Sequence, residues 1–473
     1  RLARPMIRQY LRLSESQYAV FDAVLHRREN VLLMGAPGTG KSFLLNVLKD
    51  RVRAPLVTAS TAAAADKIGA TTLHSALGLG IGTTTAEQLV RKMQQYKNRT
   101  GRTMNALTLF ETLIVDEVSM LTAGLLALAE KVLCLVRGGN RMPQLVVSGD
   151  PMQLGAVCAE RDGGPFYEAD LIKGLRPYVL TEPFRQVEDS PFLRVLNRAR
   201  LGRARETDIV WLRAHFCSAV GKDVPRLFCR LFEVEDYNQD KLEELPAGSL
   251  QIYKPTATGQ VPSWTVWAQR PGPTGQAFSG GGGTSDRELH LKVGARVLLN
   301  RNLLEYPTLH NGSCGTVRSL TPRSVVVLFD CGLEARIKPA TQEFERDGKV
   351  VGTSTKIPLM LAWAVSVHRA QGATLDAVFV DLGRCFAAGQ AYVALSRVRK
   401  AQDAEVVNLH LCHLNRIDKA ALRFYNACAE RSEKRATRRA ERAERAAGAA
   451  DEVDDESLNA MMDAFESGVS KEQ

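Results

Sequence analysis

The sequence lacks long apolar runs and closely paired cysteines. No apolar run approaches the roughly 20 residues that a helix needs to cross a bilayer, so we expect a soluble protein with no membrane partner. The nine cysteines are an odd number and include no Cys-x-x-Cys pair, which favours reduced thiols in an intracellular, reducing compartment. Cys412-His413 has no second ligand pair at the spacing of a zinc site, so no structural zinc is expected.

The length and charge of the chain set its broad class. The 473 residues exceed one ordinary domain, so two or three domains are expected. Hydrophobic residues make up 45% and charged residues 24%, a globular balance. The formal net charge of +10 and a pI of about 9.2 favour a polyanionic partner such as nucleic acid. Residue 1 is Arg rather than Met, so we expect a trimmed or processed start.

Short apolar runs alternate with helical patterns along the chain. The run at 31–34 ends in a glycine-rich turn, as a buried parallel strand does. Similar runs follow at 56–58, 113–115, 145–147 and 378–380. Apolar residues recur at helical spacing between them, as at 125–135. This alternation indicates the α/β class, with a parallel sheet covered on both faces.

Four stretches depart from that alternation. Residues 78–107 contain a capping box, Thr85-Ala86-Glu87-Gln88, and many basic side chains, which predicts a small insertion that is either a solvated helix or a nucleic-acid contact. Residues 271–285 include four consecutive glycines and predict a flexible loop. Residues at about 300–358 have a β-like texture, which predicts a small barrel insertion. Residues 429–473 are rich in Arg and Glu and predict a charged, disordered tail, with a solvated helix as the alternative.

One glycine-rich segment carries a nucleotide-binding pattern. Gly35-Ala36-Pro37-Gly38-Thr39-Gly40-Lys41-Ser42 matches G-x-x-x-x-G-K-[ST] in full, between a predicted strand and a predicted helix. Such a loop turns successive backbone N–H groups toward phosphates, so we expect all eight residues to bind a nucleotide. Lys41 is expected to reach the β- and γ-phosphates, and Ser42 to ligate Mg²⁺.

Further candidates for the chemistry follow later strands. Asp116 ends a buried strand and is expected to hold Mg²⁺, while Glu117 is expected to orient and deprotonate the attacking water. Gln153 follows a third strand and is expected to sense the γ-phosphate. Arginine fingers contribute roughly 10³ to 10⁵ in rate in P-loop enzymes, and Arg185 and Arg397 are the candidates by motif context.

The motifs, in this order, resemble those of the petite-integration-frequency (PIF) family of superfamily-one DNA helicases, in the branch that includes RecD-like motors. The resemblance covers about Leu13 to about Leu409. Besides the P-loop and the Asp116 and Gln153 motifs, it rests on Leu13-Ser14-Glu15-Ser16-Gln17, Thr58-Ala59-Ser60-Thr61 with Thr71-Thr72-Leu73-His74-Ser75, Leu180-Thr181-Glu182-Pro183-Phe184-Arg185-Gln186, Val367-His368-Arg369-Ala370-Gln371-Gly372 and Ala391-Tyr392-Val393-Ala394-Leu395-Ser396-Arg397.

The resemblance implies two RecA-like P-loop NTPase domains, at 1–178 and 179–428, that clamp one ATP between them. It also implies a wedge insertion in the first domain at about 78–107 and a small SH3-like barrel in the second. Gln17 is implied as the adenine reader, and Gln371 and Gly372 as further nucleotide contacts. The implied DNA contacts are Ser60, Thr61, Thr71, His74, His368, Arg369, Tyr392 and Ser396.

The implied activity is that of an ATP- and Mg²⁺-dependent DNA helicase. Such a monomer would move 5′ to 3′ on single-stranded DNA and open forked duplex in replication, repair, recombination or telomere maintenance, in the nucleus or mitochondrion of a eukaryote. An ATP-gated clamp or nucleoprotein remodeller needs the same residues and remains an alternative. A GTPase is disfavoured because no Asn/Thr-Lys-x-Asp motif occurs, and RNA remains open as a substrate.

Overall fold

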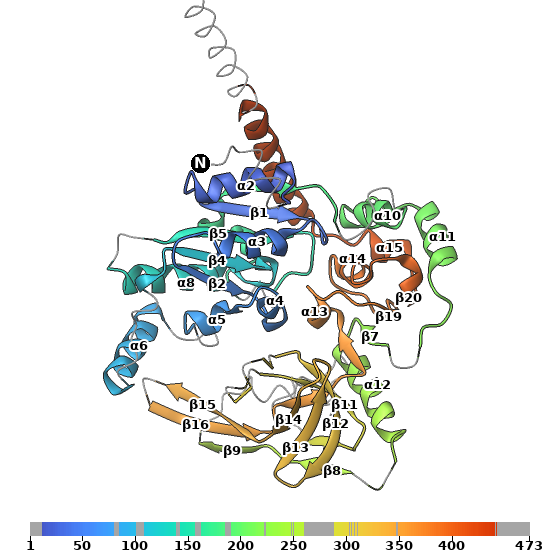
Figure 1. The fold of residues 1–473 in the computed structure, drawn as a ribbon. Coiled ribbons are helices and arrows are strands. Elements are labelled where there is room, and N and C mark those ends of the chain that lie inside the picture. The colour runs from blue at the N-terminus through green and yellow to red at the C-terminus, as the bar shows by residue number, and fades with distance from the viewer. Residues whose placement is uncertain are drawn as a thin grey trace, which may run out of the picture.

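The computed structural model describes residues 12–441 apart from 80–84, 101–107, 139–141, 157–161, 185–190, 222–223, 247, 249, 260–287, 302, 304, 307, 310, 347–348 and 440. Two parallel sheets and a group of antiparallel sheets make up this part of the chain (Figure 1). None of its helices combines the length and apolar character that a membrane crossing requires. Two parallel sheets with helical connections confirm the predicted α/β class.

The first sheet has six parallel strands in the order β3-β2-β4-β5-β1-β6. Its strands are β1 (Val31–Gly35), β2 (Pro55–Ala59), β3 (Thr71–Thr72), β4 (Thr112–Asp116), β5 (Gln144–Gly149) and β6 (Arg176–Leu180). Strand side chains alternate between two buried clusters. Leu32 lies in the cluster on one face, and Val31 and Leu33 lie in the cluster on the other. Burial on both faces explains why these strands are continuous apolar runs.

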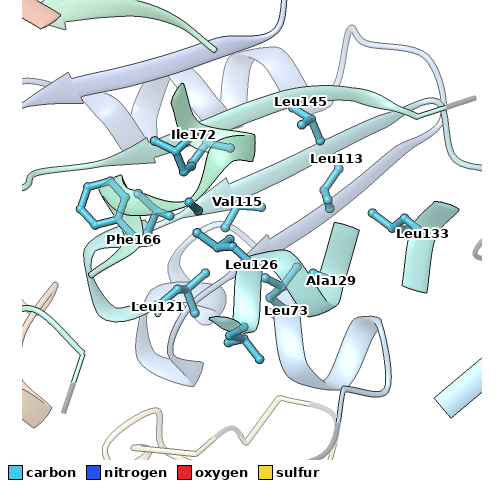
Figure 2. Packing of buried hydrophobic residues seen from close by; sticks show 14 of the residues in the cluster. Leu73, Leu113, Val115, Leu121, Leu126, Ala129, Leu133, Leu145, Phe166 and Ile172 are labelled. Atoms are coloured by element: carbon cyan, nitrogen blue, oxygen red, sulfur yellow. The ribbon is translucent and has the colours of Figure 1, made fainter. Parts of the chain in front are cut away.

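Helices cover both faces of this sheet. On the face of Leu33 lie α2 (Glu15–Leu25) and α3 (Lys41–Lys49). On the face of Leu32 lie α5 (Leu73–Ala76), α6 (Ala86–Thr100), α8 (Ala123–Val136), η3 (Phe166–Glu168) and α9 (Asp170–Lys173). Figure 2 shows Leu126 of α8 beside Val115 of the sheet and Leu133 on the side of Leu113. Two further short helices, α4 (Ala62–Lys67) and η1 (Val118–Met120), follow β2 and β4.

Helix α6 confirms the predicted capping box. The backbone N–H of Gln88 donates to the hydroxyl of Thr85, and the N–H of Thr85 donates to Oε1 of Gln88, at 3.3 and 3.1 Å. Ala86 and Leu89 are buried in the cluster shared with α8. The side chains of Lys97 and Arg99 lie outside the described residues. The first turns of this segment therefore pack on the first sheet and its covering helices, which together form the first unit.

The second sheet has four parallel strands in the order β18-β7-β19-β20. They are β7 (Arg226–Phe228), β18 (Ala364–Ser366), β19 (Val378–Asp381) and β20 (Ala404–Val407). Its connections form α10 (Pro191–Arg200), α11 (Glu206–His215), α13 (Val367–Ala370), α14 (Gln390–Leu395), η5 (Ala401–Asp403) and α15 (Leu411–Leu414). One buried cluster joins α10 and α14 to this sheet, which defines a second unit.

The antiparallel sheets are inserted between β7 and β18, after α12 (Leu231–Glu243). A five-stranded sheet has the order β14-β13-β12-β11-β17, a three-stranded sheet the order β15-β16-β9, and β8 pairs with β10. The strands are β8 (Gln251–Tyr253), β9 (Thr256–Gly259), β10 (Leu289–Leu291), β11 (Arg296–Leu299), β12 (Cys314–Thr321), β13 (Ser324–Phe329), β14 (Glu334–Ile337), β15 (Ala340–Arg346), β16 (Lys349–Lys356) and β17 (Leu359–Leu361). The predicted stretch 300–358 therefore misses the flanking strands β8 to β11 and β17. The predicted loop 271–285 lies outside the described residues.

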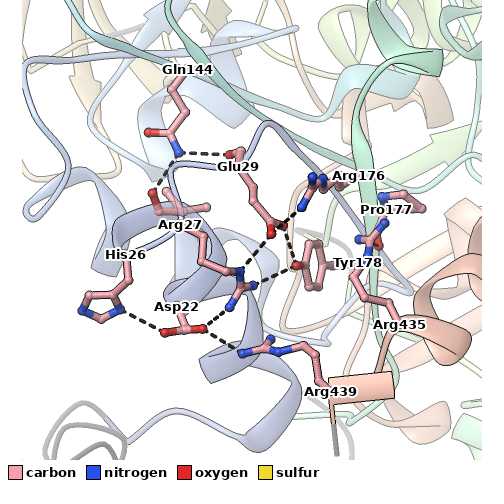
Figure 3. Close-up of polar contacts among 11 residues, drawn as sticks. Asp22, His26, Arg27, Glu29, Gln144, Arg176, Pro177, Tyr178, Arg435 and Arg439 are labelled. Atoms are coloured by element: carbon pink, nitrogen blue, oxygen red, sulfur yellow. Dashed lines mark hydrogen bonds and ion pairs between the residues drawn. The ribbon is translucent and has the colours of Figure 1, made fainter. Parts of the chain in front are cut away.

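The prediction of a disordered tail is wrong at its start, because residues 419–439 form one helix. This C-terminal helix lies against the first unit, beside α2 (Figure 1). Phe424 and Cys428 pack in the cluster of the first sheet. Arg435 donates to the carbonyl of Pro177 at 3.2 Å, and Arg439 donates to Asp22 at 2.8 Å (Figure 3). The predicted boundary at 428 thus falls within a helix, and the boundary at 178 falls within β6.

Candidate active site

The P-loop forms the predicted strand-turn-helix. Strand β1 ends at Gly35 and α3 begins at Lys41. Gly38 and Gly40 have φ angles of 85° and 78°, in the left-handed region that favours glycine. A Cβ atom at Gly40 would also lie 2.4 Å from Nε2 of Gln17. The loop therefore requires glycine at this position for both its backbone angle and the close approach of Gln17.

Lys41 is buried beneath this loop. Its Nζ donates to the carbonyls of Gly35 and Ala36 at 2.8 and 3.0 Å. Burial lowers the pKa of the Lys41 ammonium, and the carboxylates of Asp150 and Glu117 oppose that shift. The ammonium thus lies among acidic groups at the mouth of the loop, where phosphate oxygens could replace the carbonyl acceptors.

Two acidic residues face the P-loop from the end of β4. The hydroxyl of Ser42 donates to Oδ2 of Asp116 at 2.9 Å, and the N–H of Glu117 donates to Oδ1 of Asp116 at 2.9 Å. Burial and the neighbouring Asp116 raise the pKa of Glu117, whereas Lys41 and Arg397 oppose the shift. Oε2 of Glu117 is buried and has no hydrogen-bond partner among the described residues. A buried carboxylate with an unused oxygen is suited to accept a proton from water.

Gln153 lies in the turn that follows β5. Its N–H donates to the carbonyl of Asp150 at 3.1 Å, and the N–H of Met152 donates to Oδ1 of Asp150 at 3.1 Å. Oε1 of Gln153 is buried and finds no partner in the described part of the chain. The amide is therefore available to a ligand in the adjoining cavity.

Arg397 approaches the same cavity from the second unit. It is 1% exposed, and its guanidinium donates to the carbonyls of Val393 and Ala373 and to the hydroxyl of Ser396 at 2.7, 3.1 and 2.7 Å. These contacts hold its charge near Glu117. The other predicted finger, Arg185, lies outside the described residues.

A cavity of about 590 Å³ brings these groups together between the two units. The predicted residues that line it are Pro37, Gly38, Gly40, Lys41, Ser42, Asp116, Glu117, Gln153, Gly372 and Arg397. Lys67, Phe184 and Arg399 also line it and were not predicted as site residues. Phe184 directly precedes Arg185 within a recognised motif, and Arg399 lies two residues beyond the end of another. The N–H of Phe184 donates to the carbonyl of Gly38 at 2.7 Å.

The glutamines predicted to contact the nucleotide are buried near this cavity. Nε2 of Gln17 lies 3.5 Å from the carbonyl of Thr39, and Oε1 of Gln17 accepts from the N–H of Ser14. Gln371 donates to the hydroxyl of Ser119 at 3.1 Å, so a residue of the second unit bonds to the first. Gln17 therefore links α2 to the P-loop, and Gln371 links the second unit to the first.

A second and larger cavity, of about 1210 Å³, lies between the parallel units and the antiparallel sheets. Thr61, His368 and Arg369 line it together with Arg296, Arg301 and Lys356. Burial lowers the pKa of His368 and of Arg369. The concentration of basic groups fits a polyanionic ligand.

The other predicted DNA contacts lie at half-buried positions, which are Ser60, Thr71 and His74, or at buried ones, which are Tyr392 and Ser396. Ser60 follows β2, Thr71 lies in β3 and His74 in α5, all on the first unit. Tyr392 and Ser396 are 3% and 2% exposed, and neither lines the larger cavity. Ser60, Thr71 and His74 are also absent from its lining, so the structure brings none of these five residues to the larger cavity, which we call the groove. Ser396 instead accepts a hydrogen bond from Arg397.

A P-loop, two carboxylates at the end of the neighbouring strand and an arginine from a second unit define a P-loop nucleoside triphosphatase with a RecA-like fold. The family described as an AAA domain matches residues 12–217. ATP-dependent DNA helicase PIF1 of Danio rerio is 34% identical over 410 residues, which cover 84% of this chain and 61% of that protein. ATP-dependent DNA helicase Pif1 of Bdellovibrio bacteriovorus is 31% identical over 433 residues, which cover 88% of this chain and 92% of that protein.

A solved structure agrees with these relatives. The crystal structure of a Pif1 helicase from Bacteroides in complex with ADP-AlF3 and ssDNA matches with a TM-score of 0.70 and 25% identity, over 88% of this chain and 97% of that one. The chain belongs to the Pif1 family of ATP-dependent DNA helicases. It spans 61% of the length of the Danio rerio relative.

Proposed function

We propose that this chain hydrolyses ATP to move along single-stranded DNA and to separate the strands of duplex DNA. The observation that carries the proposal is the 590 Å³ cavity, which joins Lys41 and Glu117 of the first unit to Arg397 of the second. A nucleotide bound there would contact both units, so its hydrolysis could change their relative position. The names of the relatives support the same activity.

The side chains around the cavity account for hydrolysis. Glu117 takes a proton from the attacking water through a carboxylate that is buried and incompletely hydrogen-bonded. Lys41 and Arg397 place positive charge around the γ-phosphate as its negative charge spreads in the transition state. Gln153 lines the cavity with an unused amide oxygen, which can accept a hydrogen bond from that water, while its NH2 group can donate to an oxygen of the γ-phosphate.

Ser42 and Asp116 fit a magnesium ion, because a hydroxyl and a carboxylate are the oxygen ligands that Mg²⁺ prefers. Their oxygens already lie 2.9 Å apart. Among the described residues, no group of three or more His, Cys, Asp or Glu could hold a metal ion, so phosphate oxygens and water would complete its coordination. When bound, the ion would neutralise charge on the β- and γ-phosphates.

The 1210 Å³ groove is the proposed path of the DNA strand. Basic side chains from the second unit and the antiparallel sheets line it, and Thr61 reaches it from the first unit. Contacts of this kind bind phosphates without reading bases, which suits a protein that moves along a strand. We assign the predicted wedge to α6 and the predicted SH3-like barrel to the antiparallel sheets. The motif resemblance supports movement from 5′ to 3′.

One chain supplies both sides of the nucleotide cavity, since Lys41 and Arg397 belong to the same polypeptide. This arrangement supports action as a monomer. An ATP-gated clamp that does not separate strands would use the same cavity and groove, so strand separation has to be measured.

A strand-displacement assay tests the proposal. Duplex DNA with a 5′ single-stranded tail is incubated with Mg²⁺ and ATP, and the Lys41→Ala variant is the control because it removes the ammonium from the P-loop. We expect displacement by the wild type, none by the variant, and weaker displacement from a 3′ tail. DNA-stimulated ATP turnover without displacement would favour the clamp, and stronger stimulation by a matched RNA oligomer would favour an RNA substrate.

A further inference from the structure

The turn over residues 150–154 is held by both units. Gln153 lines the 590 Å³ cavity, whereas the next residue, Leu154, is 1% exposed and packs in the core of the second unit with Phe192. Met152, which precedes Gln153, also meets the second unit. A Cβ atom at Gly389, just before α14, would lie 2.6 Å from the carbonyl oxygen of Met152. The second unit therefore packs closely against a turn that continues directly from a strand of the first.

An ion pair between the units holds the start of this turn. Arg200, the last residue of α10, donates from Nε to Oδ2 of Asp150 at 3.0 Å and from Nη2 to Oδ1 at 2.7 Å. The side chains are 5% and 0% exposed. A guanidinium that binds both carboxylate oxygens fixes the distance and the plane of the carboxylate. The backbone of Met152 and Gln153 is hydrogen-bonded to Asp150, so fixing Asp150 also fixes Gln153.

The surroundings of Arg200 favour this one arrangement. The ring of Tyr425, in the C-terminal helix, lies over the guanidinium with its centroid 4.3 Å from Cζ. Burial favours the neutral form of Asp150, but the charge and hydrogen bonds of Arg200 outweigh burial and lower the pKa of Asp150. Three segments thus meet at Arg200: the turn from the first unit, α10 of the second, and the C-terminal helix.

We propose that Arg200 is a positioning residue for the ATP hydrolysis proposed above, on which this inference rests. Through Asp150 it holds Gln153 in the cavity, and it makes the position of Gln153 depend on the position of the second unit. Arg200 lies outside the residues that line the nucleotide cavity. Its loss would therefore slow the hydrolytic step more than it would weaken nucleotide binding.

Arg198 provides a matched control on the same helix. It also binds a carboxylate through two nitrogens, with Nε 2.8 Å from Oδ2 of Asp208. Both members of that pair belong to the second unit and lie outside the residues that line the nucleotide cavity. Arg198→Gln removes an ion pair from α10 without touching the turn that holds Gln153.

The test compares Arg200→Gln, Arg200→Lys, Asp150→Asn, the double variant Arg200→Gln with Asp150→Asn, and Arg198→Gln in the full chain. Single-strand-stimulated ATP turnover gives kcat and KM, a fluorescent ATP analogue gives nucleotide affinity, and thermal unfolding reports stability.

We expect Arg200→Gln to lower kcat at least about tenfold with less than about a threefold change in KM and affinity. Arg200→Lys should fall between Arg200→Gln and wild type, because one ammonium cannot reproduce the two-point contact. The double variant should lose no more than the stronger single variant, since both remove one link. Arg198→Gln should keep kcat within about twofold of wild type.

Wild-type kcat in Arg200→Gln and Asp150→Asn would overturn the proposal, as would an equal loss in Arg198→Gln. A loss of nucleotide affinity as large as the loss of kcat would also overturn it, because Arg200 would then act in binding. If Arg200→Gln does not fold, Arg200→Lys and Asp150→Asn decide in the same way, and wild-type kcat in both rejects the proposal. Lys41→Ala separates this result from the proposed function: undiminished turnover in that variant would reject the ATP site itself, whatever Arg200 does.

Discussion

The hydroxyl of Ser42 donates to Oδ2 of Asp116 at 2.9 Å, so the first turn of α3 meets the end of β4 at the proposed magnesium position. Asp116→Asn keeps the shape of this contact but removes the charge that attracts the cation. We expect the Mg²⁺ concentration at half-maximal ATP turnover to rise at least about tenfold, since carboxylate charge contributes strongly to Mg²⁺ binding. Titration of turnover with MgCl2 measures this, and an unchanged midpoint would remove Asp116 from the ion's coordination.

Glu117→Gln removes the proposed base and preserves the volume of the side chain. Turnover should fall by about 10² to 10⁴, the usual contribution of a general base, whereas binding of a fluorescent ATP analogue should survive. The same variant should be at least as stable to heat as wild type, because a buried carboxylate with a raised pKa opposes folding at neutral pH. Near-normal hydrolysis would mean that another group accepts the proton.

The raised pKa of Glu117 also sets a pH dependence. The base acts only when ionised, so kcat/KM should fall on acidification with a midpoint above the value of about 4.3 for an ordinary Glu. Burial is the main cause of the shift and Asp116 the next. Asp116→Asn, assayed at saturating Mg²⁺, should therefore move the acid limb toward lower pH. A limb that does not move would assign the titration to a different group.

Arg397→Ala should lower turnover by about 10³ to 10⁵, the range for arginine fingers, with a much smaller effect on nucleotide affinity. The substitution should also lower the stability of the fold, because the buried guanidinium donates hydrogen bonds to Val393, Ala373 and Ser396. Arg397→Lys retains the charge and provides the matched comparison. Single-turnover hydrolysis, measured beside thermal unfolding, separates the two effects, and normal hydrolysis in a folded Arg397→Ala would exclude it as a finger.

The P-loop, Asp116 and Gln153 were predictable because their motifs follow recognisable strands. Gly35, Asp116 and Gly149 end buried apolar runs, and parallel strands bring their carboxyl ends to one edge of a sheet. Tyr392 and Ser396 were harder to place because they lie in a motif on α14. Packing of α14 into the second core buries both residues, and a sequence pattern does not show which side of a short helix becomes buried.

Arg200 could not be selected from the sequence, since it is one of 62 Lys and Arg residues and its partner Asp150 is 50 positions away. The two side chains come together only because the two units pack against each other, and the sequence does not show that packing. The sequence of the C-terminal helix did contain a helical periodicity that indicates a packed face. Contacts with the first unit come from residues spaced three or four apart, as one helix face requires: Phe424, Cys428, Ser432, Arg435 and Arg439. The surrounding Arg and Glu residues hid this stripe because three of its five members are polar.

The C-terminal helix is expected to stabilise the first unit. Phe424 stacks on Tyr167 with ring centroids 5.3 Å apart and lies edge-on to Phe166 at 6.1 Å. Phe424→Ala should therefore lower the free energy of unfolding by about 2 to 3 kcal/mol, below the full cost of a wholly buried phenylalanine.

Arg439→Ala should lower the free energy of unfolding by about 1 kcal/mol or less, because its partner Asp22 is buried but also accepts hydrogen bonds from Arg27 and His26. Arg438→Ala, at an exposed position next to Arg439, is the matched control and should change nothing. Urea unfolding of the three variants, followed by circular dichroism, measures these differences. Equal stability of Phe424→Ala and wild type would show that the helix leaves the first unit in solution.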